Sequence, residues 1–279
     1  MAELAKKLHF KKDNTEHTAK AYTVTEEAGT EYITNKIDGV VCYVAIGATN
    51  DERATMGRVI KNGTKAILNS GKPPYAEKAY TSPGTYTFTV PKNVRKIRYA
   101  ICGAGSGAMG RGQYEANVSA GGNSSLNGIT ATGGSGGRIY LDHKPGGSGL
   151  NSFIAKYDQQ QGGTPNGRKG NIANNSNYNM GSEVHGGTGW ALNFNAQNGN
   201  HGKGGNGRTW NWGSCIGGGY LVAGASGGYT TGYLDVSPGQ TLSINVGGGS
   251  SGYWRGDGGN GNVDWGANGF VLIAWGGYI

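Results

Sequence analysis

The sequence predicts a mostly β protein in which a small N-terminal β module precedes a glycine-rich domain framed by β-strands. Short runs of alternating or β-branched residues recur along the chain, and helical periodicity is weak throughout. Glycine is unevenly distributed, because 7 of the 56 glycines in the 279 residues precede Gly103. All 6 Trp also follow Gly103. Since disordered low-complexity segments are poor in large aromatic residues, this glycine-rich part is expected to be ordered.

The N-terminal part contains three strand signals and then a break. Ala21–Thr25 alternates, and Val40–Ile46 is rich in β-branched and aromatic residues. The dipeptide at 62–63 is Asn-Gly and separates two runs with apolar residues, which is typical of a two-residue hairpin turn. Paired prolines in the stretch GKPPY mark a linker. The predicted organisation is an N-terminal β module (1–75), a linker (76–83) and a glycine-rich domain (84–279).

Further strand signals bracket the glycine-rich region at both of its ends. Gly84–Pro91 alternates as a half-buried strand does, and Val94–Cys102 follows it after a turn. Gly232–Val236 and Thr241–Val246 form a second strand pair around Ser-Pro-Gly. The apolar run Gly269–Trp275 suits a strand buried on both faces. Strands on both sides indicate a built substructure between them.

The dense glycine tracts predict packed, extended backbone. Extended segments of glycine can lie close together because no Cβ keeps their backbones apart. Collagen shows the same effect, since only glycine fits at the crowded axis of its triple helix. We therefore expect packed polyglycine II helices, bonded backbone to backbone, with the longer stretches between them forming surface loops. Ordering glycine is entropically costly, so dense hydrogen bonding has to offset it. The alternative is disordered glycine loops on a small β-sandwich. The tracts are Gly133–Gly137, Gly202–Gly207, Gly217–Gly219, Gly247–Gly249 and Gly256–Gly261.

Composition disfavours several classes of protein. The net charge of +8 is mostly N-terminal, where 16 Lys/Arg and 10 Asp/Glu are interspersed in residues 1–102, so no nucleic-acid partner is expected. The start of the chain lacks an apolar core of signal-peptide length, so no signal peptide is expected. The sequence also contains no run of about 18 apolar residues, so no membrane insertion is expected. Three scattered cysteines form neither a disulfide framework nor a zinc pattern. Synthesis in a reducing cytoplasm is the expectation.

Short motifs in the glycine-rich part do not predict catalysis. Gly105, Gly107 and Gly110 match G-x-G-x-x-G, but helix breakers follow where a dinucleotide fold needs a helix. Three G-x-S-x-G matches arise in glycine tracts, as composition alone would give. His185 and His201 have no further ligand at metal-binding spacing. We expect no catalytic residue, no cofactor and no metal, and therefore no enzymatic activity.

The C-terminal part of the chain resembles one known protein family. G-x-Y-x-F-x-V-P at Gly84–Pro91, the glycine tracts, VSPGQTLSINVGGG at Val236–Gly249 and GFVLIAWG at Gly269–Gly276 resemble the glycine-rich domain of bacteriophage and prophage tail-fibre proteins. The resemblance implies a receptor-binding domain in 84–279 whose loops bind a host-surface glycan or protein. Residues 1–75 resemble, more weakly, leading modules of prophage virion proteins. The implied location is the virion, with a fibre-shaft protein or a trimer of the chain as further partner.

Loops that mix aromatic rings with amides are the predicted receptor site, because rings stack on sugars and anchor contacts at low entropic cost. These loops are Tyr140–Gln161, Asn171–Asn198 and Arg208–Trp212. Trp190 and Trp210 adjoin glycine tracts, so packing over glycine backbone is the alternative for both. A bacterial surface lectin-like or structural glycine-rich protein is the alternative function. The predicted receptor-binding residues are Tyr157, Tyr178, Trp190, Phe194, Trp210, Trp212, Asn177, Asn193 and Asn211.

Overall fold

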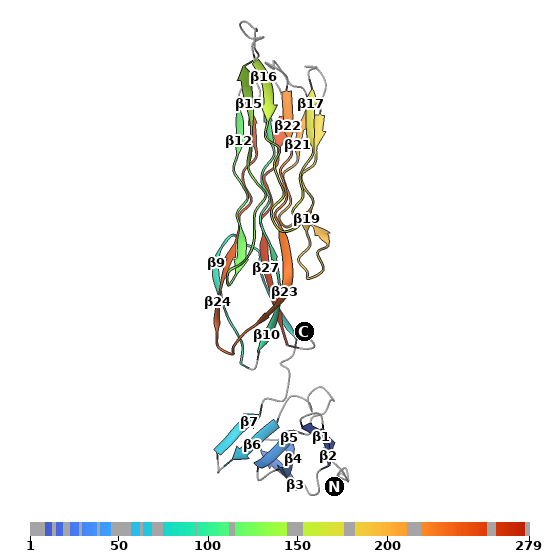
Figure 1. Ribbon diagram of the computed structural model, residues 1–279, viewed down its shortest axis with the longest axis vertical. Coiled ribbons are helices and arrows are strands. Elements are labelled where there is room, and N and C mark those ends of the chain that lie inside the picture. Colours follow the sequence, from blue (N-terminus) through green and yellow to red (C-terminus); the bar gives the residue numbers. More distant parts are fainter. Residues whose placement is uncertain are drawn as a thin grey trace. The chain divides into compact units, whose positions relative to one another are not determined.

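The computed structural model divides into two compact units, Met1–Tyr75 with Gly276–Tyr278, and Ala76–Trp275 (Figure 1). The elements in the described residues are strands, which confirms the predicted mostly β fold class. The structure describes residues 9–12, 15–18, 23–27, 30–37, 40–45, 57–61, 64–68 and 75–276, without 93, 112–114, 144–152, 176–181, 211–218 and 256–260.

The first unit contains an antiparallel meander in which each strand pairs with the next, β3 to β7, and a separate β1–β2 hairpin. The strand signals near 21–25 and 40–46 are confirmed as β3 and β5, and the strands of the predicted hairpin are confirmed as the β6–β7 pair. The predicted turn residues 62 and 63 lie outside the described residues. The strands are β1 (His9–Lys12), β2 (Thr15–Thr18), β3 (Thr23–Glu27), β4 (Thr30–Ile37), β5 (Val40–Ala45), β6 (Gly57–Lys61) and β7 (Thr64–Leu68).

The second unit starts from a sandwich of two four-stranded sheets, β23-β10-β27-β8 and β14-β13-β24-β9. Alternate residues of β24 are buried, so Leu242, Ile244 and Val246 point into a core shared with Ile97 and Val271 of the other sheet. The strands are β8 (Ala76–Tyr80), β9 (Gly84–Thr89), β10 (Lys96–Cys102), β13 (Ser124–Leu126), β14 (Ile129–Ala131), β23 (Tyr229–Asp235), β24 (Thr241–Val246) and β27 (Phe270–Trp275).

Strand β27 is covered on both faces, as its apolar run predicts. Val271 and Ile273 face the sandwich core, whereas Phe270 and Leu272 belong to a second cluster that contains Trp190. The predicted linker at 76–83 is wrong over 76–80, because β8 pairs antiparallel with β27. β8 lies at the edge of its sheet and buries only Tyr80, so its polar sequence carries no alternating apolar signal.

Small sheets form the opposite end of this unit, called the far end below (Figure 1). They are β17-β22-β11-β25, β12-β15-β16 and β18-β21-β26, and the short β19-β20 hairpin lies beside the middle of the unit. Their strands are β11 (Met109–Arg111), β12 (Ala116–Val118), β15 (Gly137–His143), β16 (Phe153–Tyr157), β17 (Ile172–Asn175), β18 (Ser182–Val184), β19 (Gly189–Trp190), β20 (Asn198–Gly199), β21 (Gly207–Thr209), β22 (Gly219–Val222), β25 (Tyr253–Arg255) and β26 (Gly261–Val263).

Extended segments join the two ends of this unit, running side by side through its middle (Figure 1). They contain no strand of their own and bond to one another through backbone N–H and C=O groups. We call them the glycine bundle. Its ten segments are 103–108, 119–123, 132–136, 158–163, 167–171, 185–188, 202–206, 223–228, 247–252 and 264–269.

Hydrogen bonds in the glycine bundle repeat every three residues. Gly103 and Ser106 donate to Gly228 and Ala225 of one neighbouring segment, each at 2.9 Å, while Gly105 donates to a different segment. A period of three is the repeat of a left-handed extended helix with three residues a turn. The polyglycine II assignment stays a prediction, which this bonding pattern supports. The same interval occurs in Gly105 and Ala108, Thr132 and Ser135, Ala223 and Ser226, Gly224 and Gly227, Asp264 and Ala267, and Gly266 and Gly269.

Two segments, 103–108 and 223–228, are buried along their whole length and lie at the centre of the bundle. Gly224 shows why glycine is needed there, since a Cβ would overlap the carbonyl oxygen of Ser106. Through backbone N–H and C=O groups, segment 103–108 bonds to six others, namely 119–123, 132–136, 202–206, 223–228, 247–252 and 264–269. Segment 223–228 likewise bonds to 103–108, 132–136, 158–163, 167–171, 185–188 and 202–206. Six neighbours around each central segment is a hexagonal arrangement.

The expected glycine tracts and loops map only partly onto this bundle. Tracts near 133–137, 202–207 and 247–249 lie in it, whereas Gly219 and Gly261 begin strands β22 and β26, and the rest of those two tracts lies outside the described residues. The prediction of surface loops is wrong where the predicted ranges overlap strands β15 to β21. It is also wrong where they overlap three bundle segments, namely 158–163, 167–171 and 185–188. Outer segments tolerate larger residues because one side faces solvent.

Candidate functional site

Two of the predicted receptor-binding aromatics are exposed near the far end. Tyr157 ends β16 with 37% of its surface exposed, and its ring lies 5.1 Å from that of Tyr220. Trp210 directly follows β21 with 54% exposed, and the Arg208 guanidinium lies 5.6 Å from its ring centroid. A ring that is half covered by a neighbour and half open keeps one face for a ligand at little entropic cost.

Burial removes Trp190 from the receptor-binding set. Its ring stacks on Tyr229 with centroids 5.0 Å apart, and its Nε1–H donates to the Gly227 carbonyl at 2.9 Å. The Arg168 guanidinium lies over the same ring at 4.4 Å. Only 3% of Trp190 is exposed, so the alternative of packing over glycine backbone holds for this residue.

Phe194 is also buried, and the prediction of a receptor contact there is corrected in the same way. The Arg98 guanidinium lies 4.7 Å from the Phe194 ring, and an Arg98 N–H donates to the Phe194 carbonyl at 3.2 Å. The neighbouring Asn193 uses its side-chain amide within the loop, donating to Gln197 at 3.0 Å and accepting from Asn195 N–H at 3.0 Å. Both side chains therefore stabilise the β19–β20 hairpin.

Four predicted site residues lie outside the described residues. Tyr178 and Asn177 lie in 176–181, between β17 and β18, and Trp212 and Asn211 lie in 211–218, between β21 and β22. The strands that flank these stretches end at the far end of the unit (Figure 1).

Sequence reasoning missed the most exposed ring among the described large hydrophobic residues. Trp265 lies within bundle segment 264–269, with 69% of its surface exposed, and Tyr253 begins β25 nearby in the chain with 37% exposed. The signal was the sequence D-W-G-A-N-G, because a large side chain inside a close-packed segment has room only on its solvent side. Trp265 extends the exposed aromatic set onto the side of the bundle, and Tyr253 adds a further ring where β25 begins.

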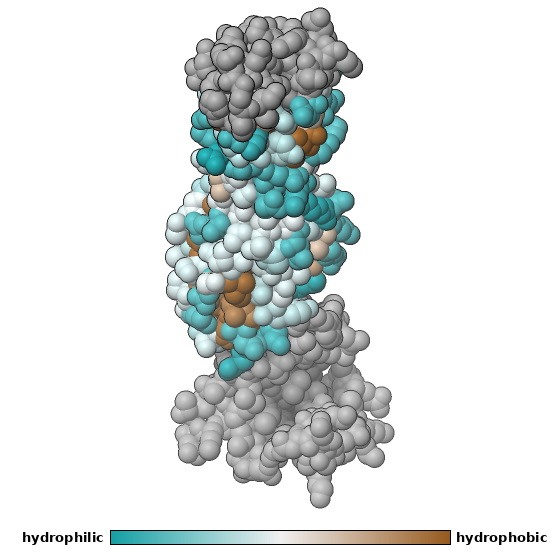
Figure 2. Space-filling model, turned by 45° about the horizontal axis from the view of Figure 1, so that its top comes forward, coloured by the Kyte–Doolittle hydropathy of each residue, from teal (hydrophilic) through white to brown (hydrophobic). Residues whose placement is uncertain are grey.

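The face of the molecule drawn in Figure 2 is mostly polar. Figure 2 shows a face on which hydrophilic and neutral residues predominate and apolar ones form small separate patches. Near the far end, the Arg138 guanidinium lies 2.9 Å from the Asp158 carboxylate, and this hydrogen bond raises the pKa of Arg138. Lys156 is paired with Asp142 in the same sheet. Exposed pairs of this kind stabilise the fold little, since water screens them.

Glycines 105, 107 and 110 do not form a nucleotide site. Segment 103–108 is buried in the bundle and continues directly into strand β11, where a dinucleotide fold places the start of a helix. Within the part of the chain that the structure describes, no three His, Cys, Asp or Glu side chains gather as metal ligands do. Burial raises the pKa of the Cys102 thiol, which disfavours the reactive thiolate.

Comparison with protein-family models finds no match for this chain, and comparison with curated proteins finds none either. In the described ranges, no helix has the length and apolar character that crossing a membrane requires.

Proposed function

We propose that this chain is a receptor-binding protein at the tip of a phage or prophage tail fibre, and that it binds a bacterial surface receptor without an enzymatic step. The observation that carries the proposal is the glycine bundle. Ten extended segments support the far-end strands, and hydrogen bonds between their backbones restrict the backbone torsions of this support. A rigid support lowers the ordering entropy that a binding surface loses when it meets its ligand.

Chain topology also supports binding at the far end. The chain runs out and back through the bundle, so strands that are far apart in the sequence, such as β12, β15, β16, β17, β21 and β22, are gathered at that end (Figure 1). Binding residues are often carried by connections that a rigid scaffold positions. Among the described residues, Tyr157 and Trp210 place exposed rings beside these connections.

The first unit fits the role of attachment. It is compact by itself and consists of a sheet and a hairpin, separate from the glycine bundle. In this proposal it joins the chain to a fibre-shaft protein or to further copies of the chain, as in a trimer. The proposed receptor is a host-surface glycan or protein, and the proposed location is the virion.

Immunogold electron microscopy tests the location. Particles would be purified from cells that produce the chain from its own genomic context, and labelled with antibody against residues 76–275. Gold at the distal end of a tail or fibre supports the proposal. Chain that is found in the cell envelope and missing from particles would support the alternative, a bacterial surface protein.

A binding assay with purified full-length chain tests the activity. Fluorescently labelled chain should bind cells of a sensitive strain saturably, and unlabelled chain should compete with phage particles for adsorption. Trp210→Ala should reduce cell binding, whereas Trp275→Phe, in the sandwich far from the far end, should not. Adsorption that excess chain leaves unchanged would contradict receptor binding.

A further inference from the structure

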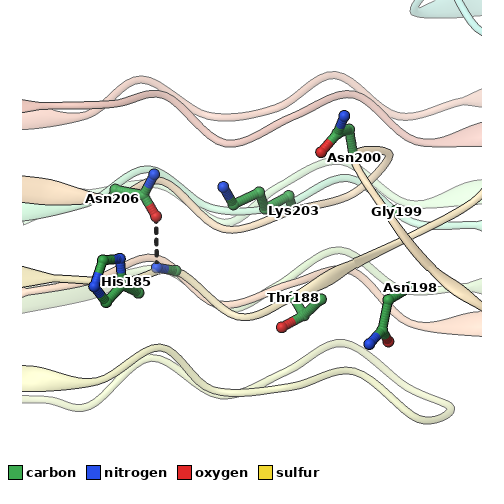
Figure 3. A pocket seen from close by; sticks show the side chains of 8 residues that line it. His185, Thr188, Asn198, Gly199, Asn200, Lys203 and Asn206 are labelled. Atoms are coloured by element: carbon green, nitrogen blue, oxygen red, sulfur yellow. Dashed lines mark hydrogen bonds between the residues drawn. The ribbon is translucent and has the colours of Figure 1, made fainter.

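A groove lined by polar side chains lies on the side of the glycine bundle (Figure 3). It encloses about 400 Å³ and is open to solvent. None of its lining residues is among the nine predicted receptor contacts, although four of them lie within the predicted loop Asn171–Asn198. The lining residues are His185, Gly186, Thr188, Asn198, Gly199, Asn200, Lys203 and Asn206.

The bundle fixes most of this lining on rigid backbone. His185 and Thr188 come from one outer segment, and Lys203 and Asn206 come from its neighbour. Gly204 N–H donates a hydrogen bond to the Gly187 carbonyl at 3.0 Å, which holds the two segments together. Both pairs are three residues apart. With the three-residue period of the bundle, each pair lies along one side of its segment, roughly 9 Å apart at about 3.1 Å per residue.

The close approach of the two segments defines the groove's floor. A Cβ at Gly186 would overlap the carbonyl oxygen of Gly204, so only glycine permits this spacing. The Asn206 side chain accepts a hydrogen bond from Gly186 N–H at 3.0 Å, which leaves its NH₂ group for a ligand (Figure 3).

The β19–β20 hairpin closes one end of the groove. Asn198 and Asn200 lie on this hairpin opposite Thr188 (Figure 3). Asn198 accepts a hydrogen bond from Arg168, whose guanidinium in turn covers the Trp190 ring. The buried Trp190 therefore holds the hairpin that carries two of the groove's amides.

The chemistry of the lining selects a hydroxyl-rich, negatively charged ligand. Amide, hydroxyl and imidazole groups donate and accept hydrogen bonds, and no Asp or Glu is among the lining residues. Within the described ranges, the Lys203 ammonium has no carboxylate partner. Cofactor and drug-like sites are mostly apolar and enclosed, so an open polar groove suits such a ligand poorly.

We propose that this groove binds an acidic saccharide unit, carboxylated or phosphorylated, with Lys203 contacting the anionic group and Thr188 and the three asparagines contacting hydroxyls. This inference rests on the proposed function, since it gives the chemical class of a receptor group and places it on the side of the bundle.

A glycan array tests the groove with the full-length chain. The array carries neutral oligosaccharides, their uronic-acid counterparts and phosphorylated oligosaccharides. We expect stronger binding to acidic glycans than to matched neutral ones, and the two acidic arms identify which anionic group is recognised. Lys203→Met should weaken this binding at least about tenfold, the loss of one charge-assisted hydrogen bond. Thr188→Val should also weaken it.

Lys169→Met is the matched control, because Lys169 is exposed on another outer segment of the bundle and does not line the groove. It should bind as the unaltered chain does, and the melting temperatures of all variants should agree. Equal binding of Lys203→Met and the unaltered chain, or no preference for acidic glycans, overturns the groove assignment. If cell binding survives Lys203→Met, the groove assignment is wrong and the proposed function stands. If the chain binds acidic glycans but does not bind cells, the groove assignment stands and the proposed function is wrong.

Discussion

Ser106 and Gln160 are hydrogen-bonded to each other inside the glycine bundle, and both side chains are fully buried. The Ser106 hydroxyl also accepts from Ala225 N–H at 2.9 Å, and the Gln160 amide donates to the Gly107 carbonyl at 3.0 Å. These two side chains therefore complete the hydrogen bonding of both central segments where the backbone alone does not.

Removing the Ser106 hydroxyl should destabilise the protein. Ser106→Ala leaves the Gln160 side-chain oxygen and the Ala225 N–H without a partner, and each buried orphan costs about 1–3 kcal/mol. We expect the free energy of unfolding to fall by about 2 kcal/mol or more in chemical denaturation. Ser251→Ala, at an exposed bundle position, is the control and should change it little. Equal effects at both positions would contradict a role for this buried pair.

A methyl group at the centre of the bundle should cost more than one at its edge. The Cβ of Gly224→Ala would overlap the Ser106 carbonyl oxygen, which is backbone and cannot turn away. At Gly248 a Cβ would meet only Pro83, at an ordinary 3.5 Å. Overpacking costs about 1–3 kcal/mol and sometimes more, so Gly224→Ala should lower the melting temperature clearly. Gly248→Ala should leave it nearly unchanged, and the reverse order would argue against close packing.

The two tryptophans Trp190 and Trp210 should separate stability from binding. Trp190→Phe removes the hydrogen bond to Gly227 and part of the stack on Tyr229, so we expect a lower melting temperature. Trp210→Ala removes an exposed ring and should leave the melting temperature within about a degree or two while reducing cell binding. Circular dichroism and cell-binding assays measure the two effects, and a Trp210 variant that melts early would point to a structural role.

Stability should fall as the pH is lowered through the range where histidine titrates. Burial lowers the pKa of His201 below its usual value of 6.5, and its ring lies 5.2 Å from Phe270. The unfolded chain then binds more protons than the folded one, so the stability contributed by neutral His201 is present above pH 6.5 and is lost as the pH falls. His201→Gln should flatten this dependence in denaturation measured between pH 7.5 and 5, and an unchanged dependence would contradict the role of His201.

The sandwich could be predicted from the sequence and the bundle only in part. Leu242 and Ile244 alternate with polar residues, and this pattern alone places β24 in a half-buried sheet. Segments 158–163 and 185–188 contain only two glycines each, so they were not recognised as dense glycine tracts. The outer side of the bundle accepts side chains, and its membership depends on bonds between residues far apart in the chain.

The exposure of the proposed receptor-binding residues was also predictable only in part. Exposure of Tyr157 and Trp210 agrees with an aromatic-rich binding loop, but the loop composition could not distinguish them from Trp190 and Phe194. Trp190 is buried by partners that lie about 40 residues further along the chain, Gly227 and Tyr229. Such a contact leaves no local signal in the sequence.

The scarcity of apolar side chains in the glycine bundle has a calorimetric consequence. The apolar clusters lie mainly in the sandwich and at the far end, while the central segments contribute peptide groups and small residues such as Ala104 and Ala225. Exposing apolar surface raises the heat capacity of unfolding, and exposing peptide surface lowers it. Scanning calorimetry of this chain should give a heat-capacity increment below the usual value of about 12–15 cal/mol/K per residue. A small increment flattens the curve of unfolding free energy against temperature. The stability of the glycine bundle should therefore vary less with temperature than that of an ordinary hydrophobic core.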